Sequence, residues 1–479
     1  MLNFACTPDA MSRRAALQLS TCGFGYLAFQ GLVGQAMAKE AANPLAIKPP
    51  HFPAKAKRVI FLCMTGGPSH LDLFDYKPQL AKDDGKAPPA GKGRGGFGGG
   101  TLMASPFKFK QHGQNGMWMS DLFPSLAKHS DEICMLNGLH TNVPAHPQAF
   151  LQMHTGTSQF VRPSLGAWTL YGLGTANENL PGFVSINPPT GNGGAQNYGS
   201  SFLPAIFQGT RIGSEGRGPG GGGGPGGRDG GGAKVANIAN PRLGKESQRA
   251  QLDFVQTLNE EKLKKDGENP QIEGVIESYE LAFRMQRDVP KVMDMSVESK
   301  DTLSMYGIGA GSTDNFGKQC LLARKFVEAG VRYVEVTYGN WDQHRNLKAD
   351  VERHTGAIDK PIAGLLADLK KRGLLQDTLV VWCGEFGRTP TSQGTDGRDH
   401  NNKGFSGWFA GGGVKGGLTY GKTDDHGFEA VEGKMHTHDF HATILHLMGL
   451  NHEKLTYKYA GRDFRLTDVH GVVAKEVIA

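Results

Sequence analysis

The sequence predicts an α/β fold in which a mostly parallel β-sheet lies between two layers of helices. Short apolar runs rich in β-branched residues alternate along the chain with longer segments of helical periodicity, the pattern of a sheet covered on both faces. Polar residues follow directly after several of these runs. Ligands of parallel sheets bind at the carboxyl ends of the strands, so these polar residues mark the expected site.

Apolar runs predict strands at residues 58–64, 132–137, 331–336, 378–383 and 405–410. The first run, RVIFLCM, breaks at Thr65-Gly66-Gly67-Pro68, as expected of a buried strand that ends in a tight loop. Helical periodicity is found at residues 147–153, 246–290, 317–329, 355–372 and 438–448.

The amino terminus predicts a targeting segment rather than a part of the fold. Arg13-Arg14 precede an apolar, small-residue stretch that ends in the A-x-A-like cleavage site Ala36-Met37-Ala38, the order of a twin-arginine export signal. We therefore expect residues 1–38 to be removed and the protein to reach the periplasm or the extracellular space. Residues 39–57 form a lead-in to one domain at 58–475. The mature chain has no run of 18 apolar residues, so we expect no membrane span.

Composition excludes several classes of protein. Much of the glycine, 69 residues in all, lies in two tracts at about 85–100 and 213–233, which we expect to be disordered insertions because they lack core-forming side chains. The net charge of +6 is small and the basic residues are scattered, which argues against nucleic acid as a partner. Six cysteines without a CxxC pair do not predict a disulfide framework.

Polar residues, most of them histidines and carboxylates, concentrate in the segments that follow the predicted strands and in one group near the end of the chain. Those after strands are His70 and Asp72; His140 and His146; Asp342 and His344; and Glu385, Arg388, Asp399 and His400. The late group is His436, His438 and His441. Imidazole and carboxylate together suit Zn²⁺ and similar divalent ions. A lone histidine is more often a structural hydrogen-bonding group, but several such groups at one end of a sheet predict a divalent metal. Zinc is favoured, and calcium or another ion stays open.

Several long motifs carry a resemblance to a known family. They are MTGGPSHLDLFDYKP at 64–78, GNWDQHRN at 339–346, DLKKRGLLQDTLVVWCGEFGRTP at 368–390, GRDH at 397–400 and HDFHATILHLMGL at 438–450. The chain resembles, over nearly all of residues 58–475, an exported sulfatase-like family that is classed as a domain of unknown function within the alkaline phosphatase and sulfatase superfamily. The resemblance implies an alkaline-phosphatase-like three-layer sandwich. It does not specify the reaction, because fold and function are separable.

The resemblance implies one metal site formed by Asp342, His344 and His400. Glu385 or Asp399 would complete that site or orient one of its histidines from behind.

A second metal site of the superfamily is incomplete in this chain. Thr65 stands at the position of its first aspartate, and Phe386 follows Glu385 where an Asp-His pair is expected. The second site therefore keeps at most one carboxylate unless His70 or Asp72 compensates.

At the position of the sulfatase nucleophile, counted back from Thr155-Gly156, the chain has His146 instead of a hydroxyl or a modified cysteine. The role of His146 stays open between nucleophile, base and further metal ligand. Arg388 is predicted either to neutralise a substrate anion or to pair with Glu385. The role of His438 stays open between that of a metal ligand and that of a residue which orients a ligand without contacting the metal.

These residues predict a metal-dependent hydrolase of a phosphate or sulfate ester carried by a small molecule or a glycan. The alternative is a non-catalytic, metal-containing binding protein that retains the fold and one metal site. The incomplete second site and the missing hydroxyl favour the alternative, whereas the number of clustered polar residues favours the enzyme. The sequence does not determine the substrate, the number of metal ions or the oligomeric state.

Overall fold

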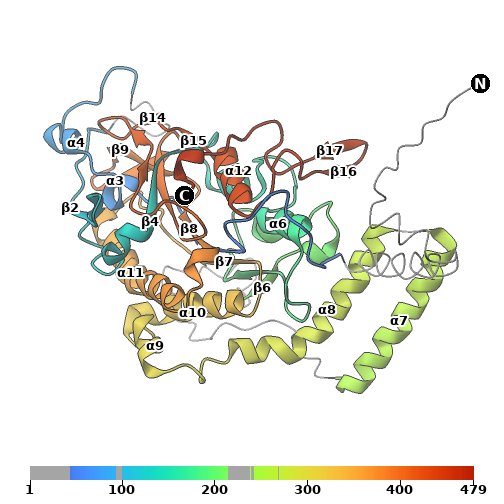
Figure 1. Cartoon of the computed structure of the whole chain (residues 1–479). Coiled ribbons are helices and arrows are strands. Elements are labelled where there is room, and N and C mark those ends of the chain that lie inside the picture. Colours follow the sequence, from blue (N-terminus) through green and yellow to red (C-terminus); the bar gives the residue numbers. More distant parts are fainter. Residues whose placement is uncertain (1–43, 93–99, 214–237, 239–241, 268) are drawn as a thin grey trace, which may run out of the picture.

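The computed structural model describes residues 44–92, 100–213, 238, 242–267 and 269–479 (Figure 1). The strands of its central sheet are β1 (Arg58–Met64), β4 (Ile133–His140), β5 (Phe183–Ile186), β6 (Thr210–Ile212), β7 (Tyr333–Tyr338), β8 (Thr378–Cys383), β11 (Phe405–Ala410), β12 (Thr419–Tyr420) and β15 (Met435–His436). Their order is β12-β4-β11-β8-β1-β7-β5-β6, and β15 also pairs with β4. Among the described pairings, β11 is antiparallel to β4 and β8, and the others are parallel. The predicted α/β fold with a mostly parallel sheet is confirmed.

Strand β1 lies at the centre of the sheet. Its residues are apolar and buried after Arg58, and its neighbours β7 and β8 place Val336 and Trp382 opposite Leu62. A continuous apolar run, rather than an alternating one, is what a strand covered on both faces requires.

One face of the sheet is covered by α5 (His146–Thr155), α6 (Leu165–Leu173) and α12 (Thr437–Leu447). Phe61 of β1 points to this face and packs on the ring of His154 in α5, with the ring centroids 5.9 Å apart. Phe409 of β11 packs in the same way on Phe440 of α12 at 5.2 Å.

The opposite face is covered by α10 (Asp314–Glu328) and α11 (Leu347–Lys371). Tyr338 of β7 contacts both helices: its ring packs on Phe316 at 5.1 Å, and its hydroxyl lies 3.1 Å from Nδ1 of His354. The sheet is therefore the middle layer of three (Figure 1).

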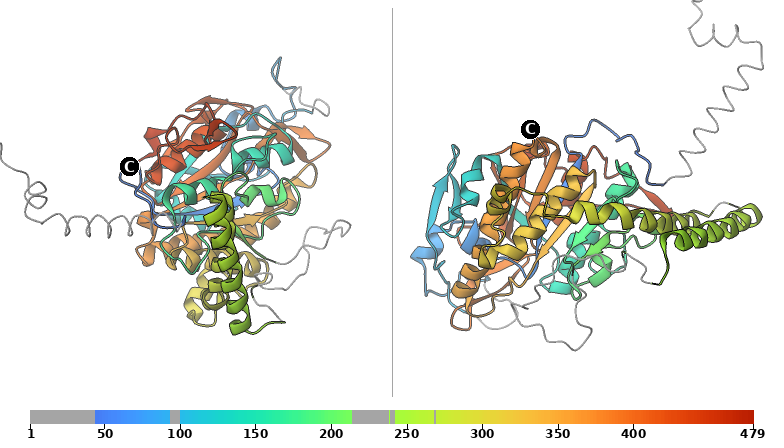
Figure 2. Two further views of the ribbon diagram at one scale, coloured as in Figure 1. Left: turned by 90° about the vertical axis from the view of Figure 1, so that its right-hand side faces the viewer. Right: turned by 90° about the horizontal axis from the view of Figure 1, so that it is seen from below.

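Two predicted helices differ from the observed ones. The helical pattern at 246–290 is two helices, α7 (Lys245–Asp266) and α8 (Pro270–Met293), which are separated by Gly267 at a φ of 82°. Helix α11 begins at Leu347 rather than at the predicted residue 355, because Leu347 and Val351 extend its buried face. Figure 2 shows α7 and α8 projecting together from the body.

Smaller elements complete the chain. Two-stranded hairpins are formed by β2 (Phe109–His112) with β3 (Met117–Ser120), β9 (Gly387–Gln393) with β10 (Gly397–Asn401), β13 (Lys422–Thr423) with β14 (Ala430–Glu432), and β16 (Tyr457–Tyr459) with β17 (Arg462–Phe464). Short α-helices are α3 (His70–Leu73), α4 (Pro78–Lys82) and α9 (Lys300–Met305). Short 3₁₀ helices occur at Leu126–Glu132, Gly194–Tyr198, Ala205–Phe207, Gly311–Thr313, Leu375–Asp377 and Lys475–Val477.

Among the described residues, no helix combines the length and the apolar character needed to cross a membrane. The predicted signal at 1–38 lies outside the described residues, as do nearly all of the predicted insertion at 213–233 and residues 93–99 of the first glycine-rich tract.

Candidate metal centre

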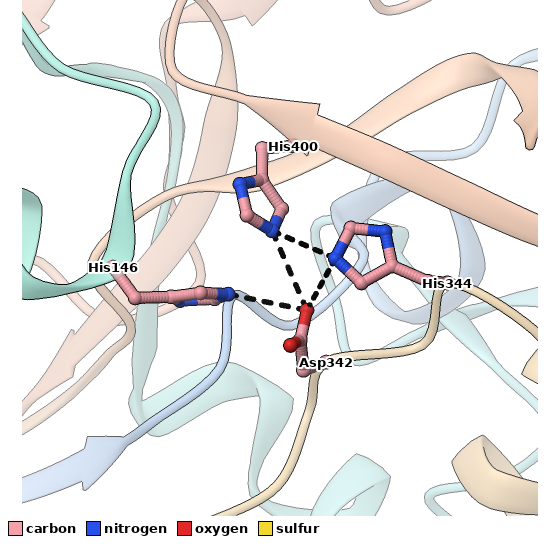
Figure 3. A group of neighbouring side chains, drawn as sticks. All are labelled: His146, Asp342, His344 and His400. Carbon is pink, nitrogen blue, oxygen red and sulfur yellow. Dashed lines mark hydrogen bonds and ion pairs between the residues drawn. The ribbon is translucent and has the colours of Figure 1, made fainter. Parts of the chain in front are cut away.

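Four side chains from three separate segments converge at one end of the sheet (Figure 3). His146 opens α5 after β4, Asp342 and His344 follow β7, and His400 lies on β10, in the hairpin after β8. Strands β4, β7 and β8 run in the same direction, so the segments that follow their carboxyl ends meet at one end of the sheet. Each residue offers one ligand atom, and these atoms all lie within 4.8 Å of one another.

The spacing of the four ligand atoms is that of one coordination sphere. Asp342 Oδ1 lies 2.8 Å from His344 Nε2, 3.1 Å from His146 Nε2 and 3.4 Å from His400 Nε2. The two Nε2 atoms of His344 and His400 are 3.0 Å apart. Donors bound at about 2.0–2.1 Å to a tetrahedral zinc ion lie about 3.3 Å from one another.

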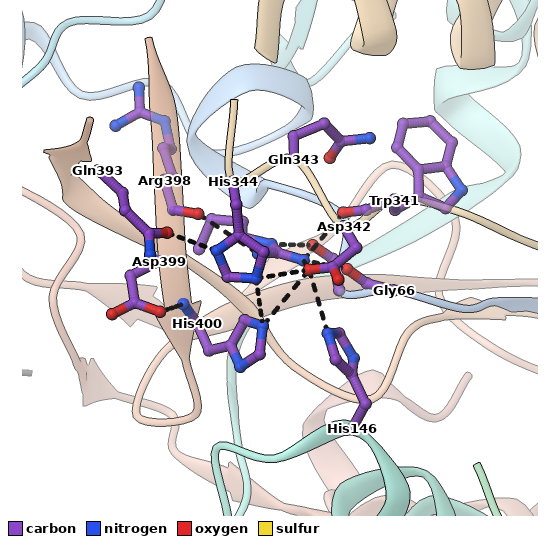
Figure 4. A network of polar contacts seen from close by, with 12 residues as sticks. Gly66, His146, Trp341, Asp342, Gln343, His344, Gln393, Arg398, Asp399 and His400 are labelled. Atoms are coloured by element: carbon purple, nitrogen blue, oxygen red, sulfur yellow. Dashed lines mark hydrogen bonds and ion pairs between the residues drawn. The ribbon is translucent and has the colours of Figure 1, made fainter. Parts of the chain in front are cut away.

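The other ring nitrogen of each histidine faces a hydrogen-bond acceptor. These acceptors are Glu385 Oε1 at 2.6 Å from Nδ1 of His146, the Pro144 carbonyl oxygen at 2.6 Å from Nδ1 of His400, and Gln393 Oε1 in contact with Nδ1 of His344. Figure 4 shows the contact between Gln393 and His344. Each acceptor favours a proton on Nδ1 and directs the Nε2 lone pair at the other ligand atoms. Metal-binding histidines are oriented in this way.

Three nitrogen lone pairs and a carboxylate oxygen that point at one another repel unless positive charge lies among them. Nε2 of His146 is buried and faces Asp342 Oδ1 at 3.1 Å without the alignment of a hydrogen bond. A buried polar atom in such a poorly aligned contact fits a position where a metal ion would bind. The donor set of three imidazoles and one carboxylate fits a divalent metal ion.

The pKa values of His146 and Asp342 also indicate that the site stabilises positive charge. Burial alone would lower the pKa of His146, but contacts with Asp342 and Glu385 outweigh burial and raise it to about 9. Burial alone would raise the pKa of Asp342, yet contacts with His146 and His400 and the charge of Arg388 hold it well below its usual range. A proton and a metal ion therefore compete for the same position, as in other histidine sites.

Arg388 is fully buried and its donors face protein acceptors. Nη2 donates to Asp342 Oδ1 at 2.7 Å, and Nε donates to the carbonyl oxygen of Gly67 at 2.8 Å. These contacts fix the carboxylate and tie the loop after β1 to the loop after β7. Among the described residues the ion-pair partner of Arg388 is Asp342 rather than Glu385.

Glu385 and Asp399 lie behind the histidines rather than among the converging atoms. Glu385 is 1% exposed and accepts from the backbone N–H of Gly66 at 2.9 Å as well as contacting His146. Asp399 accepts from the backbone N–H of His400 at 2.8 Å.

Phe386 occupies the region where the resemblance places a second metal ligand. Its ring packs on His146 at 4.7 Å and on His400 at 4.6 Å. Within the described chain one group of converging histidines and carboxylates is found, and Glu385 is not part of it.

His70 and Asp72 have other partners. Nε2 of His70 lies 3.2 Å from the carbonyl oxygen of Gly427, and Asp72 forms a buried ion pair with Arg398 at 2.8 Å. Because Arg398 lies on β10, this pair braces the strand that carries His400.

His438 anchors α5 from the far end. Its Nε2 lies 2.7 Å from the carbonyl oxygen of Gly156, and Nε2 of His441 lies 2.6 Å from that of Met153. Both histidines thus bind carbonyl groups at the end of the helix that begins with His146, where unsatisfied acceptors remain.

Gln393 and Pro144 are the site residues that sequence reasoning missed. Gln393 lies in a hairpin with no apolar periodicity, and Pro144 takes part through its carbonyl oxygen, which any residue offers. No local sequence signal identifies either one.

Gly397 allows β10 to approach the segment that carries Asp342 and His344. A Cβ atom at Gly397 would lie 2.0 Å from the carbonyl oxygen of His344. We expect Gly397→Ala to separate the two segments and to reduce bound metal, measured by elemental analysis of the purified protein. Gly356→Ala is the control, since that Cβ would meet nothing within 4 Å; equal metal content in both variants would contradict the prediction.

Comparisons with known proteins give one family match. The model of a family described as "Protein of unknown function (DUF1501)" matches residues 56–478. No curated protein matches the chain.

Several solved structures are similar to the chain at low identity. The lipoteichoic acid synthase LtaP from Listeria monocytogenes is 10% identical over 90% of this chain and 80% of its own, with a TM-score of 0.34. The PsFucS1 sulfatase from Pseudoalteromonas sp. is 12% identical over 83% and 68%, with a TM-score of 0.33. A variant of TAB5 alkaline phosphatase with Mg bound in its M3 site is 12% identical over 74% and 91%, with a TM-score of 0.29.

Proposed function

Because this chain belongs to the family described as protein of unknown function (DUF1501), its activity has to be inferred from its site, and we propose that it is an exported, metal-dependent hydrolase of phosphate or sulfate esters. The observation that carries the proposal is the convergence of His146, Asp342, His344 and His400. These four residues would hold a single divalent ion, with zinc favoured by three imidazole ligands.

A divalent ion would balance the negative charge of the site. Asp342, Glu385 and Asp399 supply three negative charges and Arg388 one positive charge, which leaves a net charge of −2. A divalent ion changes this sum to 0, so the ion itself is the positive charge that would meet an anionic substrate. Such an ion would polarise an ester oxygen or lower the pKa of a water molecule.

The protein's own residues prepare the site. Glu385 holds Nδ1 of His146, and Arg388 holds the carboxylate of Asp342 in one orientation. The contacts of His146 favour the role of fourth metal ligand over that of nucleophile, because both of its ring nitrogens face protein groups. Export is supported by Arg13-Arg14 and the cleavage site at 36–38.

The proposal is tested on protein purified after export. We expect elemental analysis to find about one divalent ion per chain, and an aryl phosphate or an aryl sulfate to be hydrolysed. A strong chelator should abolish turnover, and addition of the lost metal should restore it. Protein without bound metal, or turnover that survives complete metal removal, would contradict the proposal.

Glu385→Gln tests the orientation of His146. The amide keeps the shape of the side chain but removes the charge that stabilises the Nδ1 proton. We expect metal affinity to fall about 10–100-fold, the usual cost of losing such an outer partner. Titration with a competing chelator measures it, and Asp399→Asn, which alters a contact to the backbone of His400, serves as the comparison. Unchanged affinity in Glu385→Gln would remove Glu385 from the site.

The alternative function is a non-catalytic protein that binds metal. It is favoured by Phe386, which packs against two of the ligand residues where a second metal ligand is expected. Protein that retains one tightly bound ion but turns over neither class of ester would establish this alternative.

A further inference from the structure

A buried ion pair lies between α5 and the sheet, outside the groups that form the metal centre. Nε2 of His154 on α5 lies 3.2 Å from Oε2 of Glu335 on β7, and the two side chains are 3% and 1% exposed. Nδ1 of His154 lies 2.8 Å from the carbonyl oxygen of Phe150, so both ring nitrogens face acceptors. Burial alone would lower the pKa of His154, but the charge of Glu335 outweighs burial and raises it.

The surroundings of this pair are mostly apolar. The ring of His154 packs on Phe61 at 5.9 Å and on Phe150 at 4.5 Å. Oε1 of Glu335 accepts from the hydroxyl of Thr337 at 3.3 Å, whereas Oε2 faces His154. Taking two charges out of water costs free energy, and apolar residues of similar volume are often as stable or more stable. The stability of the core therefore does not by itself account for the pair.

The pair joins the two elements that position ligand residues of the metal centre. Helix α5 begins with His146, and Asp342 and His344 follow β7. Among the described residues, His154 and Glu335 form the ion pair that links α5 to β7. His154 follows His146 by eight residues, about 12 Å along the helix. Any displacement of α5 at His154 therefore also moves His146.

The other contacts of α5 do not fix it against β7. Its apolar side chains, such as Phe150, are buried, but burial of apolar surface has no preferred direction. Thr141 donates to Gln152 at 2.9 Å and ties α5 to the loop after β4. His438 and His441 bind carbonyl groups at the far end of α5 and tie it to α12.

We propose that the His154–Glu335 pair fixes the position of α5 along β7 and thereby places His146 in the metal centre. The inference rests on the metal centre proposed above, and it makes His154 and Glu335 positioning residues that do not contact the ion. A metal site needs its donor distances within about 0.2 Å of their ideal values. A small displacement of α5 is therefore enough to remove His146 from the ligands.

The test is a variant that removes both charges, Glu335→Met together with His154→Leu. The apolar pair has a similar volume and leaves no unpaired charge, so we expect its thermal unfolding midpoint to stay near that of the wild type. We expect its metal affinity, titrated with a competing chelator, to fall about 10–100-fold, as when a partner behind the ligands is lost. The visible absorption of the Co²⁺-loaded variant should also change, because it depends on the number and geometry of the ligands.

Asp368→Asn is the matched control, on the opposite face of the sheet. Asp368 of α11 pairs with Arg324 of α10 at 2.9 Å, and both side chains are 2% exposed. Neutralising one partner of a buried pair is destabilising, so we expect a lower unfolding midpoint with wild-type metal affinity and Co²⁺ absorption. If metal affinity falls as far in this control as in the double variant, loss of stability alone explains the effect and the proposal is wrong.

Crystal structures of the metal-free proteins test the placement of α5 without the metal. We expect α5 to be shifted along β7 in the double variant and unshifted in Asp368→Asn. The distance between His146 Nε2 and Asp342 Oδ1, 3.1 Å in the wild type, should increase in the double variant alone. An unshifted α5 in that variant, or wild-type metal affinity and Co²⁺ absorption, would overturn the proposal. Wild-type protein that binds no metal would instead contradict the proposed function, and the crystal structures would still decide what positions α5.

Discussion

Asp342→Asn is expected to abolish both metal binding and turnover. Asp342 Oδ1 is the atom on which all three histidines converge, at 2.8–3.4 Å. The amide is nearly isosteric but carries no charge, so the variant loses the anionic ligand and brings the uncompensated charge of Arg388 close to the ion. We expect metal affinity to fall by more than the about 10–100-fold that the loss of an outer partner costs.

Asp396→Asn is the matched control for this variant. Asp396 is an exposed aspartate in the turn between β9 and β10 that accepts from the backbone N–H of Asn346 and contacts no ligand atom. Elemental analysis and ester turnover should remain at the wild-type level. If Asp342→Asn retains full metal and full turnover, the metal centre has been assigned to the wrong residues. If it loses the metal but keeps turnover, the ion has no part in the reaction.

The free energy of unfolding is expected to fall steeply below pH 6.5. Burial lowers the pKa of His441 to about 3 and that of His70 to about 4, against an ordinary value of 6.5. Between these pKa values the unfolded chain takes up protons that the folded chain does not. The contribution of these histidines to the free energy of unfolding is therefore complete above pH 6.5 and is lost as the pH falls below it. Each histidine contributes a slope of about 1.4 kcal/mol per pH unit.

Urea unfolding of metal-free protein at several pH values between 4 and 8 measures this slope. The glutamine of His441→Gln can still donate to the carbonyl oxygen of Met153 but does not titrate, so the slope should decrease by about 1.4 kcal/mol per pH unit. His146 acts with the opposite sign in a separate window: its pKa of about 9 gives stability below pH 6.5 that is lost as the pH rises through 9. An unchanged slope in His441→Gln would show that this histidine is not the group that resists protonation.

Much of the fold and part of the site follow from local pattern. The apolar run at 58–64 predicts a central strand because a strand covered on both faces needs apolar residues at every position. Asp342 and His344 are two residues apart directly after a predicted strand, so their proximity does not depend on the rest of the chain. Strand β5 and the β9–β10 hairpin were not predicted, because their apolar residues follow no clear periodicity.

The sequence by itself therefore determined the α/β class, the end of the sheet that carries the site, and Asp342 and His344 as a pair. The family resemblance already implied that His400 belongs with them, and only the tertiary structure decided that His146 joins them and how each side chain is oriented. His400 is oriented by the carbonyl oxygen of Pro144, 256 positions earlier in the chain. Arg388 was predicted to act on a substrate or to pair with Glu385, and in the structure it is buried and donates to Asp342. The direction of a side chain depends on its partners in space, which local sequence patterns do not contain.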